Sequence, residues 1–150
     1  MQYPKYNATV SFAYDYYEFI SIGHKGEILK GILFHQTTVN PFFYNCVLGD
    51  VKEDGRIDAY VVTNNGDMEK VLATVAAAAF EFSFQYPDCY IVLKGSNEVR
   101  TRLYRMAINV NYDELIEEFD IWGMFGEYEI IEDFDKGTVK DYDAFLVKRK

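Results

Sequence analysis

The stretch Asn64–Lys94 reads NNGDMEKVLATVAAAAFEFSFQYPDCYIVLK, and it has the pattern of a helix followed by a strand. Asp67 is a typical N-cap residue, because its carboxylate can accept hydrogen bonds from free backbone N–H groups, and Pro87 marks the helix end. One side of the helix is apolar at helical spacing, with Met68, Leu72, Val75, Ala79 and Phe82. The opposite stripe is polar or small, with Lys70, Thr74, Ala77, Glu81 and Gln85. The short, β-rich segment Asp88–Lys94 then predicts a strand.

Upstream of this stretch, the chain has the features of β-strands. Four segments are predicted as strands: Tyr16–Ile22, Glu27–His35, Phe42–Asp50 and Arg56–Thr63. The turn Gly23–Gly26 joins the first two, and the Asp54-Gly55 pair is a hairpin signal between the last two. These short connections predict an antiparallel meander of four strands.

Downstream, a second helix is predicted after Gly95, with Ser96 or Asn97 as its N-cap. Its apolar face contains Val99, Leu103, Met106, Ala107 and Val110. A further helical turn begins near Asn111, which forms a capping-box pattern with Glu114. Two more strands are predicted: 121–131, with a glycine bend at Gly123 or Gly126, and 142–150, with a basic end.

Together these elements predict an α+β fold in a single domain over residues 1–150. An N-terminal antiparallel four-stranded meander is followed by β-α-β-α-β elements, with the two main helices packed on the sheet. If the strands of the second part share one sheet, right-handed crossovers make them parallel and bring both helix N-termini to the same edge. Ligands tend to bind at that edge, beyond the carboxyl ends of the strands.

The location of the protein is also constrained by the sequence. The start of the chain lacks the basic and apolar blocks of a signal peptide. The longest apolar stretch, Val71–Phe84, contains Glu81 and is too short to cross a bilayer. We therefore expect a cytoplasmic protein that does not bind membranes.

Residues that bind metals or catalyse reactions are sparse. Cys46 and Cys89 form no CxxC pair and are expected to be free thiols, and His24 and His35 lack further ligands at metal spacing. The chain has no GxSxG, GxxxxGKS/T, GxGxxG or HExxH motif. We therefore expect no metal and no cofactor.

A cluster of positive charge stands out in a chain whose net charge is −9. The segment Lys94–Arg105 contains four basic residues and one acid, so it carries +3 and the rest of the chain carries −12. Arg100 lies about 60° from the centre of the predicted apolar face, in the first helical turn. A cation there meets the positive end of the helix dipole, so Arg100 requires an anionic partner.

Two kinds of partner are open for Arg100. The first is a carboxylate of the same chain, with Asp50, Asp58 and Asp67 as candidates, because arginine forms planar paired contacts with carboxylates. The second is an anionic ligand at the edge where the two helices begin. Such a site uses backbone N–H groups and side chains of Asn65, Asp67, Ser96, Asn97, Arg100, Arg102 and Arg105.

Several segments carry a resemblance to a known family: YEFISIGHKG, VVTNNGDMEKVLATVA, GSNEVRTRLYRMAI and AFLVKRK. They resemble a family of small bacterial proteins of unknown function, and the resemblance covers nearly the whole chain. Its most specific parts are Asn64–Ala76 and Gly95–Ile108, the two strand-to-helix junctions. The family has no established activity, so the resemblance implies no catalytic residue.

Three functions are compatible with these features. The favoured one is a non-catalytic binding module for an anionic small molecule, a short nucleic acid or an acidic protein partner. The charge of −9 opposes any large nucleic-acid footprint. A second is a structural or assembly role, such as a homo-oligomer, in which the aromatic residues and the acidic segment Asp113–Asp135 form an interface. A third is a nuclease-like enzyme for phosphate-bearing substrates, with Arg100 or Arg102 stabilising charge and Tyr104 or His24 carrying protons.

Overall fold

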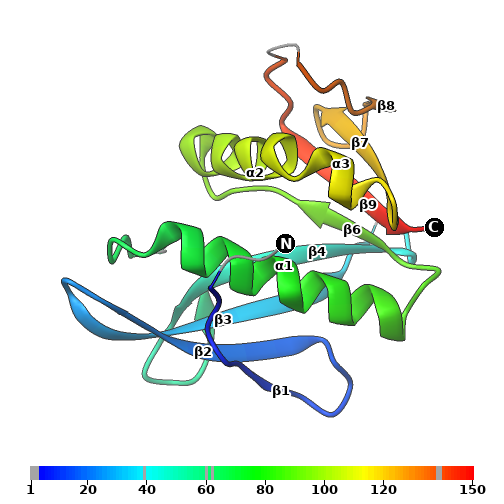
Figure 1. Cartoon of the computed structure of the whole chain (residues 1–150). Helices are drawn as coiled ribbons and strands as arrows, with labels where there is room; N and C mark the ends of the chain where they lie inside the picture. The colour runs from blue at the N-terminus through cyan, green and yellow to red at the C-terminus, as the bar shows by residue number, and fades with distance from the viewer. Residues whose placement is uncertain (1–3, 39, 60, 62, 138–139) are drawn as a thin grey trace.

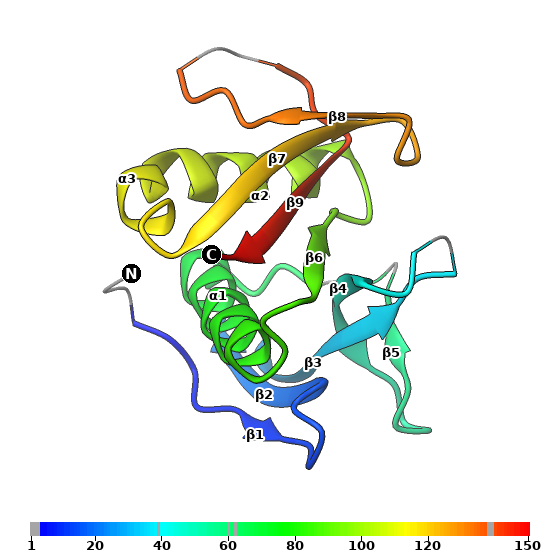
Figure 2. The ribbon, with the colours of Figure 1, turned by 90° about the vertical axis from the view of Figure 1, so that its right-hand side faces the viewer.

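The computed structural model describes residues 4–38, 40–59, 61, 63–137 and 140–150. Its strands are β1 (Thr9–Val10), β2 (Tyr16–Gly23), β3 (Gly26–Gln36), β4 (Phe43–Val51), β5 (Ile57–Asp58), β6 (Tyr90–Leu93), β7 (Phe119–Phe125), β8 (Ile130–Asp133) and β9 (Ala144–Arg149). Its helices are α1 (Met68–Gln85), α2 (Glu98–Val110) and α3 (Tyr112–Leu115). The strands described form one sheet in the order β1-β2-β3-β4-β6-β9-β7-β8, with β5 paired to β4 beside this path. The sheet curves around α1 and α2, which lie on the same side of it (Figures 1 and 2).

The predicted α+β class and the N-terminal meander are confirmed. β2, β3 and β4 pair antiparallel in sequence order, and β1 extends the sheet beyond β2. The fourth predicted strand, 56–63, is a strand only at Ile57–Asp58 among the described residues, and positions 60 and 62 lie outside them. A turn follows, in which Val61 N donates to the Asp58 carbonyl at 3.2 Å, so the regular pairing stops although the Val61 carbonyl still accepts from Asp50 N of β4 at 2.9 Å.

The second half of the sheet is built around β6. This strand pairs parallel with β4 on one side and antiparallel with β9 on the other. β9 also pairs antiparallel with β7, so β6 and β7 run in the same direction with the last strand of the chain inserted between them. The predicted parallel direction therefore holds for β6 and β7. It is wrong for 56–63, because β5 runs antiparallel to β4 and hence to β6.

The strand predicted at 121–131 is a hairpin instead of one bent strand. β7 and β8 pair antiparallel, and the turn between them contains Gly126 at φ +67° and Tyr128 at φ +66°. Glycine has no Cβ, so Gly126 adopts its positive φ without steric strain. The Gly126 N–H donates a hydrogen bond to Asp143 Oδ2 at 2.7 Å. Gly126 therefore lies in a turn that reverses the chain, and not at a bend within one strand.

α1 has the predicted bounds, and its contacts explain which face is buried. Thr74, predicted on the polar stripe, is buried because its Oγ1 accepts a hydrogen bond from Tyr6 N at 2.9 Å. Phe82 stacks on Phe34 of the sheet, with ring centroids 4.3 Å apart. At the far end Arg149, from the basic terminus, donates to the Phe80 carbonyl at 3.1 Å, so a cation lies at the C-terminal end of the helix.

The predicted apolar face of α2 does not pack on the sheet. The buried residues are Thr101, Tyr104 and Ile108, whereas Met106 and Val110 are 53% and 70% exposed. The apolar face is turned towards α1 and lines a groove between the two helices. Asn97 caps α2 as expected, because its Oδ1 accepts from Arg100 N at 2.9 Å.

The capping box predicted at Asn111 is wrong. The Asn111 side chain makes no cap hydrogen bond at the start of α3; its Nδ2 donates backwards to the Ala107 carbonyl at 2.8 Å. The predicted helical turn itself is present as α3. Asn111 thus serves the end of α2, because an amide can donate to the last free carbonyls of a helix.

A buried polar network fastens the segment before α1 to the meander, and we call it the anchor network. Lys30 is 1% exposed; its Nζ binds Asp50 Oδ1 at 2.6 Å and the Thr63 carbonyl at 2.9 Å. Asn65 accepts from Lys25 N at 2.7 Å and donates to the Gly26 carbonyl at 2.9 Å. These contacts fix where α1 starts relative to β3 and β4.

Asp67 belongs to the same network. It occupies the N-cap position of α1, but its side chain makes no cap hydrogen bond, so the predicted capping role is wrong. Its Oδ2 accepts from Tyr6 Oη at 2.5 Å and from Ser21 Oγ at 2.6 Å. The carboxylate therefore ties the N-terminal segment to β2 beneath the start of the helix.

The anchor network predicts a large and specific cost for neutralising Asp50. Asp50→Asn leaves the buried Lys30 cation without its counter-charge, which should lower the free energy of unfolding by ~3–5 kcal/mol. Asp54→Asn is the control, because its pair with Arg56 is exposed and should leave stability almost unchanged. Urea unfolding measures both. Equal losses in the two variants would contradict a stabilising role for the buried pair.

Asp67 predicts a pH dependence of stability. Burial raises its pKa, but hydrogen bonds from Ser21 and Tyr6 outweigh this and hold the pKa below its usual value. A depressed folded-state pKa adds stability that is complete above the unfolded pKa of ~3.9 and is lost as the pH falls through the folded value. The stability difference between the wild type and Asp67→Asn should therefore shrink as the pH falls from about 5 to about 2. A difference that stays constant over this range would refute the assignment.

Candidate functional site

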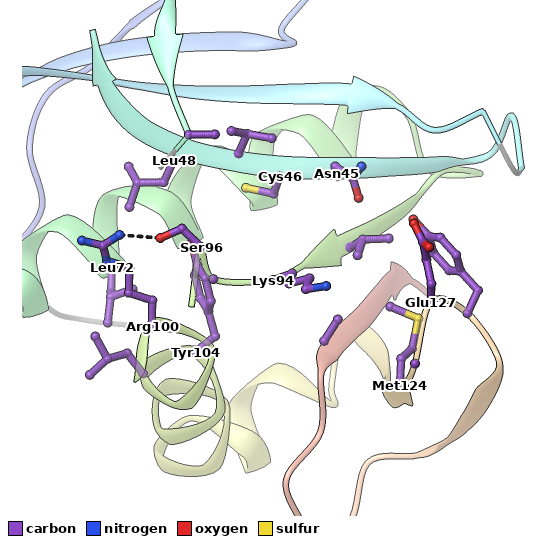
Figure 3. A pocket seen from close by; sticks show the side chains of 18 of the residues that line it. Asn45, Cys46, Leu48, Leu72, Lys94, Ser96, Arg100, Tyr104, Met124 and Glu127 are labelled. Carbon is purple, nitrogen blue, oxygen red and sulfur yellow. Dashed lines mark hydrogen bonds between the residues drawn. The ribbon is translucent and has the colours of Figure 1, made fainter. Parts of the chain in front are cut away.

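The short central strand leaves an open space at its carboxyl end. Only Phe43–Cys46 of β4 pairs with β6, and β4 then continues to Val51 past the point where β6 stops. A cavity of about 410 Å³ lies there, between β4, the start of α1, the first turns of α2 and the β7–β8 turn. This volume is within the range of small-molecule sites. Figure 3 shows Asn45 and Cys46 on one wall, Ser96, Arg100 and Tyr104 on a second, and Met124 and Glu127 on a third.

The link between β6 and α2 is tightly built and places two polar side chains on the cavity wall. A Cβ on Gly95 would lie 2.3 Å from Thr101 N, so a larger residue cannot occupy this position without moving α2. Gly95 N donates to Thr101 Oγ1 at 3.0 Å, which closes the chain around the start of the helix. Ser96 and Arg100 then lie side by side, with Arg100 Nη1 donating to Ser96 Oγ (Figure 3).

Two of the three carboxylates considered as internal partners of Arg100 bind other side chains. Asp50 binds Lys30 and Thr63, and Asp67 binds Tyr6 and Ser21. Both therefore serve the anchor network. The cavity contains one further cation, Lys94, and one acid, Glu127, so its ionisable side chains sum to one positive charge.

Tyr104 presents a hydroxyl group to the cavity. The side chain is 8% exposed and lines the cavity, and within the described part of the chain its hydroxyl makes no hydrogen bond. Burial, together with the nearby Cys46, raises the pKa of Tyr104 although Arg100 opposes the shift. The hydroxyl is therefore a neutral donor, and it is open to the cavity because it is not among the buried unpartnered atoms of the described residues.

Chemical catalysis finds little support among these residues. Burial raises the pKa of the Cys46 thiol to about 12, so it is neither a thiolate nor a nucleophile at neutral pH. His24 lies in the β2–β3 turn and does not line the cavity. In the described ranges, no group of three or more His, Cys, Asp and Glu side chains is arranged to hold a metal ion.

The residues predicted for the anion site divide into three groups. Ser96 and Arg100 line the cavity at the end of β6. Ser96 also lines a second cavity of about 360 Å³, with Asn97, Arg102 and Arg105. Asn65 and Asp67 line neither cavity, because their side chains are bound in the anchor network.

The second cavity is electrically balanced. Its basic residues are Lys94, Arg102 and Arg105, and its acidic residues are Glu98, Asp141 and Asp143. Arg105 Nη1 donates to the Lys140 carbonyl at 3.3 Å and lies 3.7 Å from Asp141 Oδ1, so part of its charge is already compensated. The first cavity is therefore the better place for an anion.

Sequence reasoning missed several residues of the first cavity. Asn45 and Cys46 come from β4, and Met124, Glu127 and Tyr128 come from the β7–β8 hairpin. The first two reach the cavity because β4 pairs with β6, and the hairpin residues because β9 inserts between β6 and β7; no local pattern reports either pairing. Tyr104 could have been found from its place one turn after Arg100.

Because the Tyr104 hydroxyl is open to the cavity and has no partner among the described residues, we expect an unusual result for a largely buried tyrosine. Tyr104→Phe removes a group without an internal partner, so the free energy of unfolding should stay unchanged or rise slightly. Tyr17→Phe is the control, because Tyr17 Oη donates to Glu81 Oε1 at 2.9 Å and its loss should cost ~1 kcal/mol. Chemical denaturation compares the two. An equal loss in both variants would show that Tyr104 has a structural partner.

Comparison with known proteins identifies a family but no function. None of the helices described is long and apolar enough to cross a membrane. Neither the curated proteins nor the solved structures contain a match to the sequence. Residues 2–150, nearly the whole chain, match a family of unknown function, DUF6934. The chain therefore belongs to this family.

Proposed function

We propose that this protein is a non-catalytic binding module that holds a small anionic molecule in the cavity at the carboxyl end of β6. The main support is the Tyr104 hydroxyl, which is open to the cavity and makes no hydrogen bond among the described residues, so it is available to donate to a ligand. Ser96 and Arg100 stand beside it as further donors. A carboxylate or phosphate oxygen could accept from all three groups.

The start of α2 adds to the attraction for an anion. Free N–H groups at a helix N-terminus carry partial positive charge, and Asn97 occupies only the N–H of Arg100. Lys94, at the end of β6, also lines the cavity and is exposed to solvent. The cavity thus concentrates positive potential in a chain that is otherwise acidic.

A small ligand suits the site better than a polymer. The net charge of −9 repels a nucleic-acid backbone, whereas a single anion feels mainly the local charges. The cavity is also lined by Leu48, Leu72 and Met124, which favour a ligand with an apolar part. Two free cysteines are compatible with a cytoplasmic setting, which we propose for this binding.

The proposal is tested with two arginine variants on the same helix. Inorganic phosphate, adenosine monophosphate and octanoate serve as probes in calorimetry and in NMR titrations that follow the amides of Gly95 and Ser96. Arg100→Gln should weaken binding of the best probe by ~10- to 100-fold, because it removes a charged hydrogen-bond donor. Arg102→Gln is the control and should change affinity by less than a factor of about two, because Arg102 is exposed and lies outside the first cavity.

Two results would contradict the proposal. In one, none of the probes shifts the amides of Gly95 and Ser96. In the other, both variants weaken binding equally, which would indicate general charge attraction without a defined site.

A further inference from the structure

An apolar groove continues from the cavity between the two long helices. It has a volume of about 370 Å³ and lies over the sheet, whose Leu93, Ile121 and Val147 also line it. α1 and α2 form its walls and do not pack closely against one another. Of the described residues that line it, only Glu69 is charged. Concave apolar surfaces of this kind are typical of binding sites.

The groove and the cavity are neighbours. Met68, Leu72, Leu103 and Tyr104 line both of them. These residues belong to the first turns of α1 and α2, so the cavity lies where both helices begin. From there the groove follows α1 as far as Phe80 and α2 as far as Val110. At 1.5 Å per residue, the wall from Met68 to Phe80 is ~18 Å long.

The lining of the groove indicates the chemistry of its occupant. Its walls are mainly apolar side chains over ~18 Å, and it opens at one end into the polar cavity. The groove therefore suits the hydrocarbon chain of a ligand whose polar end lies in the cavity.

The charge at the near end selects the head group. Lys94 and Arg100 line the cavity together with one acid, Glu127, and Glu69 lines the adjoining groove as an exposed residue. An anionic head group is therefore best placed in the cavity, beside the two cations. Arg100 binds a planar carboxylate well, and the Ser96 and Tyr104 hydroxyls can donate to its oxygens. We infer that the ligand is a free acyl carboxylate, with its carboxylate at Arg100, Ser96 and Tyr104 and its hydrocarbon chain in the groove between α1 and α2. This inference rests on the proposed function and specifies its ligand class.

The test uses a series of carboxylates of increasing length. Butanoate, octanoate and dodecanoate, each below its micellar concentration, are titrated into the full chain by calorimetry. Affinity should rise by about fourfold for each added methylene that is buried. Arg100→Gln should weaken every member of the series by a similar factor, because all share the head group.

Variants of residues in the groove then test where the hydrocarbon chain of the ligand lies. Ala79→Phe fills the far half of the groove, so it should remove the gain of dodecanoate over octanoate and leave octanoate binding unchanged. Ala77→Phe is the matched control on the same helix, outside the groove lining, and should preserve the gain. Val110→Glu is a second variant, chosen because Val110 is exposed and the substitution should leave the fold intact. It should weaken dodecanoate binding, because it places a negative charge beside the hydrocarbon chain of the ligand.

The outcomes separate this inference from the proposed function. Phosphate or butanoate binding that depends on Arg100, with no gain from chain length, would overturn the inference and leave the proposed function standing. A gain from chain length that is unaffected by Arg100→Gln would overturn the placement of the carboxylate. Failure of every probe would overturn both. Light scattering adds one further outcome: a dimer that dodecanoate does not dissociate and that Val110→Glu disrupts would assign the groove to a second copy of the chain.

Discussion

The structure depends on one short strand that joins two halves of the sheet. β6 has four residues, and it pairs parallel with β4 and antiparallel with β9. Through it the N-terminal meander and the C-terminal strands become one sheet. Ile91 is fully buried and Val92 nearly so, which is expected for a strand covered on both faces. Its length also decides where the sheet opens, because β4 continues to Val51 beyond the end of β6.

The candidate site follows from this geometry and from the start of two helices. The chain leaves β6 at Lys94, turns at Gly95 and enters α2 with Ser96 and Arg100 on the wall of the opening. The anchor network, through Lys30 and Asp50, holds the start of α1 on the opposite side. Because each helix packs on its own part of the sheet, a groove remains between them. The polar cavity and the apolar groove therefore lie end to end, which suits a ligand with a polar head group and an apolar chain.

Local features of the sequence predicted the helices and the first turn, but not the caps at Asp67 and Asn111, whose side chains bind elsewhere. Asn97 and Pro87 mark helix ends through chemistry that depends on a few neighbours, and the turn at Gly23–Gly26 fixes the β2–β3 hairpin. The direction of the α2 apolar face could not be predicted in this way. Its residues are apolar as expected, but only the tertiary structure decides that Tyr104 faces the core and Met106 faces the groove. The insertion of β9 is likewise non-local, so the hairpin side of the cavity could not be inferred.

In the proposed complex, one ligand spans the polar cavity and the apolar groove in a fixed direction. The most direct measurement is an isotope-filtered NMR experiment on the protein bound to ¹³C-labelled dodecanoate. We expect nuclear Overhauser contacts from the methylene beside the carboxylate to Tyr104 and Ser96, and from the terminal methyl group to Ala76, Ala79 or Val110. Contacts in the reverse order, or contacts confined to the exposed outer face of the sheet, would contradict it.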